Sequence, residues 1–421
     1  MIRNAVTAFF RMCVRIFFRR IELLGMERVP DGPVIFAVNH PNGLVDPLFL
    51  LCFAPRPVSF LAKAPLFRYP IIGWFVRTFD TIPVYRKQDN TAGTNEETFS
   101  RSREVLQGGG SIAIFPEGTT HDDPRLRALK TGAARIALGA DVAAMTVVPT
   151  GIYYTAKHVF RSSALVLFGE AIHVQPLAVK GEPPAAEVEQ LTRAIDAGLD
   201  AVTLQADSHA ALSLIARAED IFTADDRQPL AEEFDLRRQF IAGYHYLCAR
   251  DPQRLERLQQ AIAQFEAELR HARLDVHELR PRLDARRLFR LVVLLPLAVL
   301  GAAVSYPTYR LVGVLARRFA KGEGNVLATM KFLGALLLYP LTYLLLGICA
   351  GLRFGAVWGV ACALALPLLG YLALVVFEEA DDAIGDLRAV RHRALRGAGH
   401  ARLLAQREAI RDEMIAVARE M

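Results

Sequence analysis

The hydrophobic pattern between residues 26 and 182 predicts one α/β domain. Short apolar runs of strand type alternate there with segments whose apolar residues recur at helical spacing, such as Asn95–Gln107 and Leu129–Leu138. Alternation of this kind favours a mixed, largely parallel sheet flanked by helices, with ligands bound where strands end. The six predicted strands are Val34–Val38, Val58–Ala62, Thr81–Tyr85, Ser111–Phe115, Thr146–Thr150 and Ala164–Phe168.

Residues 1–25 precede this domain with the pattern of an amphipathic helix. Apolar residues recur at steps of three and four, and Arg11, Arg15 and Arg19 form a stripe on another side. We expect this helix to lie in the lipid headgroup layer with its apolar face down. The alternative is a first helix that packs on the α/β domain. The apolar residues are Val6, Phe9, Phe10, Cys13, Val14, Phe17, Ile21 and Leu24.

Residues 183–286 predict a helical region, because they are rich in Ala, Leu, Glu, Arg and Gln and carry few strand signals. Asp251 and Pro252 have the character of a helix cap and a first helical residue. A heptad seam of two repeats follows, which is too short for a long coiled coil, so we expect a small bundle. The seam residues are Leu255, Leu258, Ile262, Phe265 and Leu269.

Residues 287–377 predict a membrane region with two or three spans. Its apolar segments are Leu288–Leu315, Phe332–Ala350 and Gly355–Phe377, and each contains proline. The second and third have about the length needed to cross a hydrocarbon core of roughly 30 Å. Residues 378–421 then carry mixed charge at helical spacing, which predicts a solvated or surface-lying tail helix.

Basic residues on both sides of the first apolar segment bear on its topology. If positive loops stay in the cytoplasm, this segment enters the membrane and returns as a proline-bent hairpin. The second and third segments then cross and recross, and the C-terminus lies inside. The alternative is three full spans with the C-terminus outside. The basic residues are Arg286, Arg287 and Arg290 before the segment and Arg317, Arg318, Lys321 and Lys331 after it.

Composition supports a lipid partner and disfavours a nucleic acid. The 421-residue chain is 52% apolar, and 50 basic against 44 acidic residues give a net charge of +6. A basic balance beside apolar segments fits an anionic lipid surface. No zinc-finger pattern, RNA-binding aromatic signature or dense Lys/Arg run indicates nucleic acid. The five cysteines form no CxxC pair, so we expect no disulfide framework and a reducing, cytoplasmic side for the polar domains.

The first candidate chemistry follows the predicted strand Val34–Val38. The loop Asn39–Pro47 carries His40 and, six residues later, Asp46. Histidine is suited to take a proton near neutral pH, and a carboxylate bonded to its far nitrogen would fix the tautomer and stabilise the imidazolium. No serine or cysteine nucleophile is needed if the substrate brings its own hydroxyl. The alternative is a structural loop histidine and a helix-capping aspartate.

A second candidate block is Phe115–Thr120, with the sequence FPEGTT. Its proline and glycine predict a turn, and it offers the carboxylate of Glu117 and backbone N–H groups that suit an anion. Gly108–Gly110 lies just before the predicted strand Ser111–Phe115, whereas a phosphate-binding loop follows a strand. It also lacks the lysine of such a loop. We therefore expect those glycines to end a helix.

With these two blocks the sequence resembles the glycerolipid acyltransferase family, which makes lysophosphatidate and phosphatidate. The family pairs an NH-x4-D block, similar to Asn39–Asp46, with a later FPEGTR block, similar to Phe115–Thr120. Two further blocks lie in matching order. Ile82–Arg86 resembles the family's second motif, which ends in a substrate-binding arginine, and Val147–Gly151 resembles its fourth. The resemblance covers residues 26–175 and includes Lys63 and Lys130 at matching places.

Two departures from the family pattern bear on the substrate. Five residues, not four, separate His40 from Asp46, and this longer spacing resembles a branch that includes glycerol-3-phosphate and dihydroxyacetone-phosphate acyltransferases. Thr120 stands where the common block has arginine. A contact to the substrate phosphate is therefore expected from backbone groups or from Arg86, Lys130 or His121.

The resemblance implies a membrane-bound O-acyltransferase without a cofactor or metal. It would move a fatty acyl group from acyl-CoA or acyl-carrier protein to a hydroxyl of glycerol-3-phosphate or 1-acylglycerol-3-phosphate, at the cytoplasmic face of the cell membrane. His40 would be the catalytic base, and Asp46 would orient it. The implied substrate-binding residues are Arg86, Glu117, Gly118, Thr119 and Lys130.

Other function classes fit the sequence less well. A catalytically inactive, membrane-anchored lipid-binding scaffold is the main alternative, and the presence of both His40 and Asp46 argues against it. A serine lipid hydrolase is disfavoured because Ala113 stands where a nucleophile elbow around Ser111 needs glycine. A transporter is disfavoured because three apolar segments make few spans and none carries an internal carboxylate.

Overall fold

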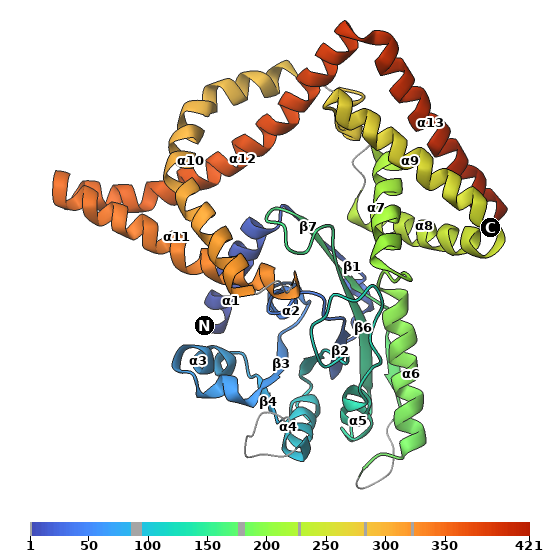
Figure 1. Ribbon diagram of the computed structural model, residues 1–421. Coiled ribbons are helices and arrows are strands. Elements are labelled where there is room, and N and C mark those ends of the chain that lie inside the picture. Colours follow the sequence, from blue (N-terminus) through green and yellow to red (C-terminus); the bar gives the residue numbers. More distant parts are fainter. Residues whose placement is uncertain (1, 86–94, 176–181, 226–228, 282–283, 321–323) are drawn as a thin grey trace. The chain divides into compact units, whose positions relative to one another are not determined.

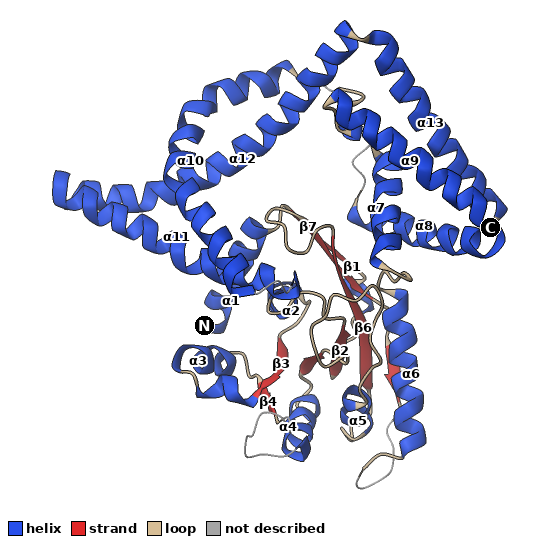
Figure 2. Cartoon of the chain, in the orientation of Figure 1, coloured by secondary structure: helices blue, strands red, loops and turns tan. Residues whose placement is uncertain are grey.

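The computed structural model describes residues 2–85, 95–175, 182–225, 229–281, 284–320 and 324–421. The chain divides into two compact units (Figure 1). Residues 1–205 and 320–329 form the first, named the sheet unit here, and residues 206–319 and 330–421 form the second, the helical unit. Figure 2 places the described strands in the sheet unit, and the described elements of the helical unit are helices.

The sheet unit is built on one mixed sheet with the strand order β1-β7-β6-β2-β5-β3-β4, and β8 also pairs with β6. β6 runs antiparallel to β7 and β8, and the other described pairs are parallel, so the predicted largely parallel sheet is confirmed. The strands are β1 (Arg20–Leu24), β2 (Val34–Val38), β3 (Val58–Lys63), β4 (Ile82–Val84), β5 (Ser111–Ile114), β6 (Met145–Tyr154), β7 (Ser163–Phe168) and β8 (Ile172–Val174).

Helices cover both faces of this sheet, because its strands are apolar on both sides. Ile35 of β2 packs on one face in a cluster that includes Ile136 of α5 and Ile195 of α6. On the other face, the rings of Phe18 and Phe49 contact Tyr154 of β6. The helices are α1 (Ile2–Phe17), α2 (Val45–Phe53), α3 (Pro70–Thr78), α4 (Asn95–Gln107), α5 (Gly132–Leu138) and α6 (Ala185–Ala201).

The N-terminal helix is shorter than the sequence pattern predicts. α1 ends at Phe17, and Arg20–Leu24 form β1, which pairs in parallel with β7. Ile21 and Leu24 continue the helical spacing, but so short an apolar segment fits a strand equally well. Pairing with β7 favours the strand, because it satisfies the backbone N–H and C=O groups of Arg20–Leu24.

α1 has one packed side and one exposed side. Val14 and Phe17 are buried, and the Phe10 ring contacts Phe75 of α3 at 5.3 Å between centroids. The alternative of a helix packed on the α/β domain therefore holds for that side. Contact with lipid headgroups stays a prediction for the other side, where Ile2, Phe9, Met12 and Ile16 are exposed.

The helical unit contains one bundle with a shared core. Asp251 caps α9 as predicted, because its side chain accepts the N–H of Arg254 at 2.9 Å. Four of the five predicted seam residues are buried in that core together with residues of α13, so the prediction of a solvated tail helix is wrong for α13. The bundle helices are α7 (His209–Thr223), α8 (Leu230–Arg250), α9 (Pro252–Ala272) and α13 (Gly397–Glu420).

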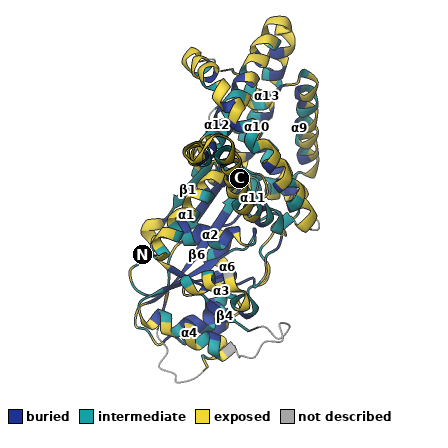
Figure 3. Cartoon of the chain, turned by 90° about the vertical axis from the view of Figure 1, so that its left-hand side faces the viewer, coloured by how far each residue is buried: buried dark blue, intermediate teal, exposed yellow. Residues whose placement is uncertain are grey.

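Among the described residues, three helices are long and apolar enough to cross a membrane: α10 (Ala285–Ala320), α11 (Gly324–Phe354) and α12 (Ala356–Leu395). Figure 3 shows extensive exposed surface on these helices. α10 is one continuous helix that contains Pro296 and Pro307, so the predicted hairpin in this segment is wrong. Proline bends a helix without reversing the chain, provided that neighbouring groups satisfy the freed carbonyls.

Candidate active site

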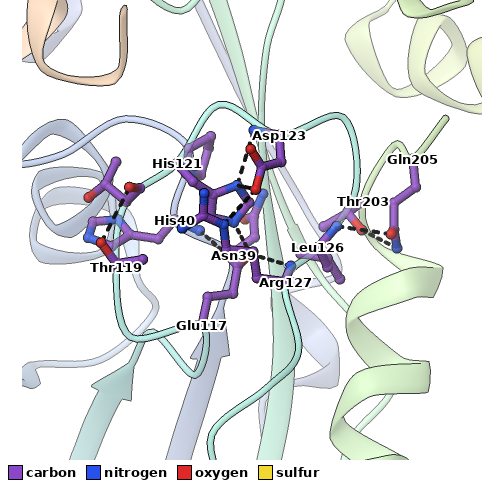
Figure 4. A network of polar contacts seen from close by, with 12 residues as sticks. Asn39, His40, Glu117, Thr119, His121, Asp123, Leu126, Arg127, Thr203 and Gln205 are labelled. Carbon is purple, nitrogen blue, oxygen red and sulfur yellow. Dashed lines mark hydrogen bonds and ion pairs between the residues drawn. The ribbon is translucent and has the colours of Figure 1, made fainter. Parts of the chain in front are cut away.

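The candidate site lies where three adjacent strands end. β2 is flanked in parallel by β5 and β6, so the carboxyl ends of all three meet at one edge of the sheet. His40 follows β2, Glu117 follows β5, and Tyr154 is the last residue of β6. The two sequence blocks that carry His40 and Glu117 are therefore neighbours in space, as Figure 4 shows.

His40 and Asp46 form a hydrogen-bonded pair. Nδ1 of His40 lies 2.9 Å from Oδ2 of Asp46. The Asp46 side chain is fully buried, whereas that of His40 keeps 17% of its exposure. A carboxylate at Nδ1 favours the tautomer that carries its proton there, and in that tautomer Nε2 can accept a proton.

The loop between these two residues accommodates its extra residue. The backbone N–H of Asn42 donates to Oδ2 of Asp46 at 2.7 Å, and Gly43 takes a positive φ of 49°. Asp46 lies in the first turn of α2, where the helix N-terminus favours a negative charge. The N-cap of α2 is Leu44, so Asp46 is not the capping residue that the structural alternative required.

The His40 ring and backbone are held from two sides. Phe115 stacks on the imidazole with ring centroids 4.2 Å apart and an interplanar angle of 25°. Asn39 accepts the N–H of Ile152 at 2.7 Å and donates to its carbonyl at 3.1 Å. These two bonds extend the link between β2 and β6 past the strand, so the backbone that carries His40 is fixed.

Glu117 is a buried carboxylate that joins three segments of the site (Figure 4). Oε1 accepts the backbone N–H of His40 at 2.9 Å. Oε2 accepts the N–H of Arg127 at 3.1 Å and pairs with Nε2 of His121. Both oxygens are thus engaged within the protein. The predicted contact of Glu117 with substrate stays a prediction, while its observed contacts support the His40 loop.

His121 does not fit the expectation that it contacts a substrate phosphate. The side chain is buried, and Nε2 faces Glu117. Nδ1 accepts the backbone N–H of Asp123 at 3.2 Å. Both ring nitrogens are therefore occupied inside the protein, and the imidazole supports Glu117 instead.

Gly118, Thr119 and Lys130 lie together at the turn that follows β5. Gly118 has a φ of 75°, and a Cβ there would overlap the Lys130 side chain. Lys130 donates its backbone N–H to the carbonyl of Pro116 at 2.8 Å, and both Thr119 and Lys130 are exposed. An exposed ammonium beside this turn suits an anionic ligand. Arg86, the other predicted phosphate contact, lies outside the described residues.

Sequence reasoning missed two polar residues of the site, Tyr154 and Lys157. The Tyr154 hydroxyl donates to Oδ1 of Asp46 at 2.7 Å. Burial and the adjacent Asp46 charge raise the pKa of Tyr154 well above its ordinary value, so the hydroxyl remains a donor. Lys157 Nζ donates to the carbonyl of Pro41 at 3.2 Å and pairs with Asp122. The available sequence signal was the predicted strand Thr146–Thr150, which the structure extends as β6 as far as Tyr154.

Metal chemistry has no candidate centre in the part of the chain that the structure describes. No group of three or more His, Cys, Asp or Glu side chains is placed there to hold a metal ion. The observed arrangement is the His40 imidazole paired with the buried Asp46 carboxylate, with Lys130 exposed beside the turn that follows β5.

Two family models match the chain over most of its length. The model described as "Acyltransferase" matches residues 20–153, which include both His40 and Glu117. The model described as "Glycerol-3-phosphate acyltransferase 2 C-terminal domain" matches residues 215–421, which fall mainly in the helical unit.

Individual relatives agree with these matches. Glycerol-3-phosphate O-acyltransferase 2 of Saccharomyces cerevisiae is 30% identical over 284 residues, which are 59% of this chain and 37% of the relative. Glycerol-3-phosphate O-acyltransferase 1 of the same yeast is 25% identical over 78% of this chain and 58% of the relative. The chloroplastic 1-acyl-sn-glycerol-3-phosphate acyltransferase LPAT1 of Arabidopsis thaliana is 32% identical over 33% of this chain and 38% of the relative. The chain thus matches less than two thirds of the length of each.

Proposed function

Since this chain belongs to the glycerolipid acyltransferase family, we propose that it transfers a fatty acyl group from an acyl thioester to a hydroxyl of a phosphorylated glycerol. The observation that carries the proposal is the His40–Asp46 pair, with Nδ1 and Oδ2 2.9 Å apart and the carboxylate fully buried. A base so oriented suits a reaction in which the acceptor hydroxyl is the nucleophile.

The reaction needs one proton to move twice. Nε2 of His40 takes the proton of the acceptor hydroxyl as its oxygen attacks the thioester carbonyl. The tetrahedral intermediate then expels the thiolate, which receives that proton from the imidazolium and leaves as the free thiol. Asp46 stabilises the imidazolium between the two transfers. General base catalysis of this kind contributes about a hundredfold to ten-thousandfold.

The acceptor is glycerol-3-phosphate or 1-acylglycerol-3-phosphate, and we favour glycerol-3-phosphate. The five-residue spacing between His40 and Asp46 supports this choice. So do the printed names of the two yeast relatives. The ammonium of Lys130 and the guanidinium of Arg86 are the proposed ligands of the acceptor phosphate. The donor is acyl-CoA or acyl-carrier protein.

The proposed location is the cytoplasmic face of the cell membrane. Three helices are long and apolar enough to cross a bilayer, and α1 presents exposed Phe9 and Met12. An acyl thioester and a lipid product both partition into a membrane surface, so an anchored enzyme meets them at high local concentration.

The test is acyl transfer by the full chain in phospholipid vesicles. Palmitoyl-CoA is offered with each acceptor in turn, and the lipid products are separated by class. His40→Ala should lower kcat about a hundredfold to ten-thousandfold. His173→Ala is the matched control, because His173 is exposed on β8, which pairs with the start of β6.

An inactive lipid-binding scaffold is the second candidate function. It would give no turnover with either acceptor, or a turnover that His40→Ala leaves unchanged. Either result would refute the proposed function.

A further inference from the structure

Asp46 is a buried carboxylate whose two oxygens are held by different parts of the chain. Oδ2 faces Nδ1 of His40 and accepts the backbone N–H of Asn42, so both contacts are local. Oδ1 accepts the hydroxyl of Tyr154 at 2.7 Å, across a separation of 108 residues in the sequence. The plane of the carboxylate therefore depends on a residue of β6.

Tyr154 is itself held in place by aromatic packing. Its ring lies against Phe49 of α2, with centroids 5.7 Å apart at 69°, and against Phe18, with centroids 5.6 Å apart at 32°. The residue retains 9% of its exposure. A clamped ring leaves the hydroxyl little freedom beyond rotation about the C–O bond, so its donor direction is set by the fold.

We propose that Tyr154 is a positioning residue of the active site, which holds the Asp46 carboxylate in line with Nδ1 of His40. This inference rests on the proposed acyl transfer. Without the hydroxyl, Oδ1 would be buried without that donor, and the carboxylate would gain by rotating towards another. Such a rotation would turn the imidazole away from the acceptor hydroxyl, and small errors of this kind slow a reaction strongly. Tyr154 thus acts through Asp46.

The experiment compares Tyr154→Phe with Tyr153→Phe in the vesicle assay, with glycerol-3-phosphate and palmitoyl-CoA. The two residues are neighbours in β6 and point to opposite faces of the sheet. Each variant loses one phenolic hydroxyl, and the hydroxyl of Tyr154 is the one that donates to Asp46. Loss of a hydrogen bond to a buried charge predicts a fall in kcat of about tenfold to a hundredfold for Tyr154→Phe. The KM of the acceptor should change less than about twofold, and Tyr153→Phe should keep kcat within about twofold.

Two further variants separate positioning from a general effect on the fold. In an Asp46→Asn background, Tyr154→Phe should add little to the loss, because residues that act as a unit are not additive. A p-aminophenylalanine at position 154 keeps a weaker donor on the same ring, so it should give a kcat between those of tyrosine and phenylalanine. This variant alone carries the test if Tyr154→Phe does not fold.

The outcomes distinguish the two proposals. A full chain without turnover on either acceptor would refute the proposed function. An active chain in which Tyr154→Phe matches Tyr153→Phe, or lowers kcat by the same factor with and without Asp46, would overturn the role of Tyr154. So would a p-aminophenylalanine variant with unchanged kcat.

Discussion

Glu117 and Asp46 are two buried carboxylates that hold the same histidine in different ways. Asp46 contacts the His40 ring at Nδ1, and Glu117 accepts the His40 backbone N–H. Each has both oxygens engaged by donors from the protein. An amide in place of either carboxylate would point an NH₂ group at a donor, so an isosteric change at either position should weaken the contacts that hold His40.

Glu117→Gln tests this dependence. The glutamine amide has one oxygen, so one of its two orientations leaves the His40 N–H without an acceptor, and the other leaves the Arg127 N–H and His121 without one. The free energy of unfolding should therefore fall by about 1–3 kcal/mol. Chemical denaturation followed by circular dichroism measures the change. Glu96→Gln, exposed on α4, should stay within about 0.5 kcal/mol of the unsubstituted chain. Equal stabilities for the two variants would contradict a structural role for Glu117.

The His40–Asp46 pair was predictable because both residues lie in one short segment after an apolar strand. Tyr154 was not, since its contact with Asp46 depends on which strands are neighbours in the sheet. His121 was one of several alternatives for the phosphate contact, considered because Thr120 stands where the common block has arginine. The sequence cannot indicate that both of its nitrogens already have partners.

Among the larger elements, α7 and α8 are joined by a buried ion pair. Oε2 of Glu219 accepts from Nε of Arg237 at 2.5 Å, and Glu219 is almost fully buried. Burial raises the pKa of Glu219 to about 7, and the Arg237 charge opposes the rise without cancelling it. A buried pair of this kind adds less stability than its short distance suggests, because both charges lose their hydration.

This pair predicts a pH dependence of stability. Folding raises the pKa of Glu219 from about 4.5 to about 7, so the folded state binds this proton more tightly than the unfolded state. The stability that the protonated carboxyl contributes is therefore fully present below pH 4.5 and is lost as the pH rises through about 7. Glu219→Gln cannot ionise, so its melting temperature relative to the unsubstituted chain should increase between pH 5 and pH 8. Melting of the full chain in detergent across this range measures the difference. Glu256→Gln, exposed on α9, is the control, and a constant difference for Glu219→Gln would refute the prediction.

The elements that the sequence misassigned share a physical cause. Arg20–Leu24 fitted a helix locally but form a strand because β7 offers backbone partners. α13 has the charge pattern of a solvated helix, yet Ile410 and Met414 are buried against α9 and its neighbours. In both cases tertiary contacts outweigh the local pattern, and a local sequence pattern does not show these contacts.

For the molecule as a whole, the bundle constrains how the chain crosses a membrane. α9 precedes the three apolar helices and α13 follows them, yet both share one core, and Arg254 contacts Glu413 at 2.6 Å. We therefore expect the chain to return to the side of the membrane from which it left, which requires an even number of crossings. Basic residues on both sides of α10 favour α11 and α12 as the crossing pair.

Cysteine labelling measures this topology. Single-cysteine chains carry Cys248 on α8, Met421→Cys at the C-terminus, or Leu352→Cys near the turn between α11 and α12. In sealed right-side-out vesicles, a membrane-impermeant maleimide should label only Leu352→Cys, and disruption of the vesicles should expose all three. Labels on opposite sides for Cys248 and Met421→Cys would indicate three crossings and would contradict the packing of α13 on α9.

The strand order of the sheet also has a consequence in time. His40 follows β2, whose two neighbours are β5 and β6, and both are synthesised later than β3 and β4. Until β6 is complete, the apolar residues of β2 lack one flanking strand and Asp46 lacks the hydroxyl of Tyr154. Contacts between distant parts of a chain form slowly, and the apolar surface that they bury stays exposed to solvent until they form. A nascent chain that has reached Thr120 therefore holds both motif blocks but lacks β6, the strand that pairs with β2 and supplies Tyr154 to Asp46.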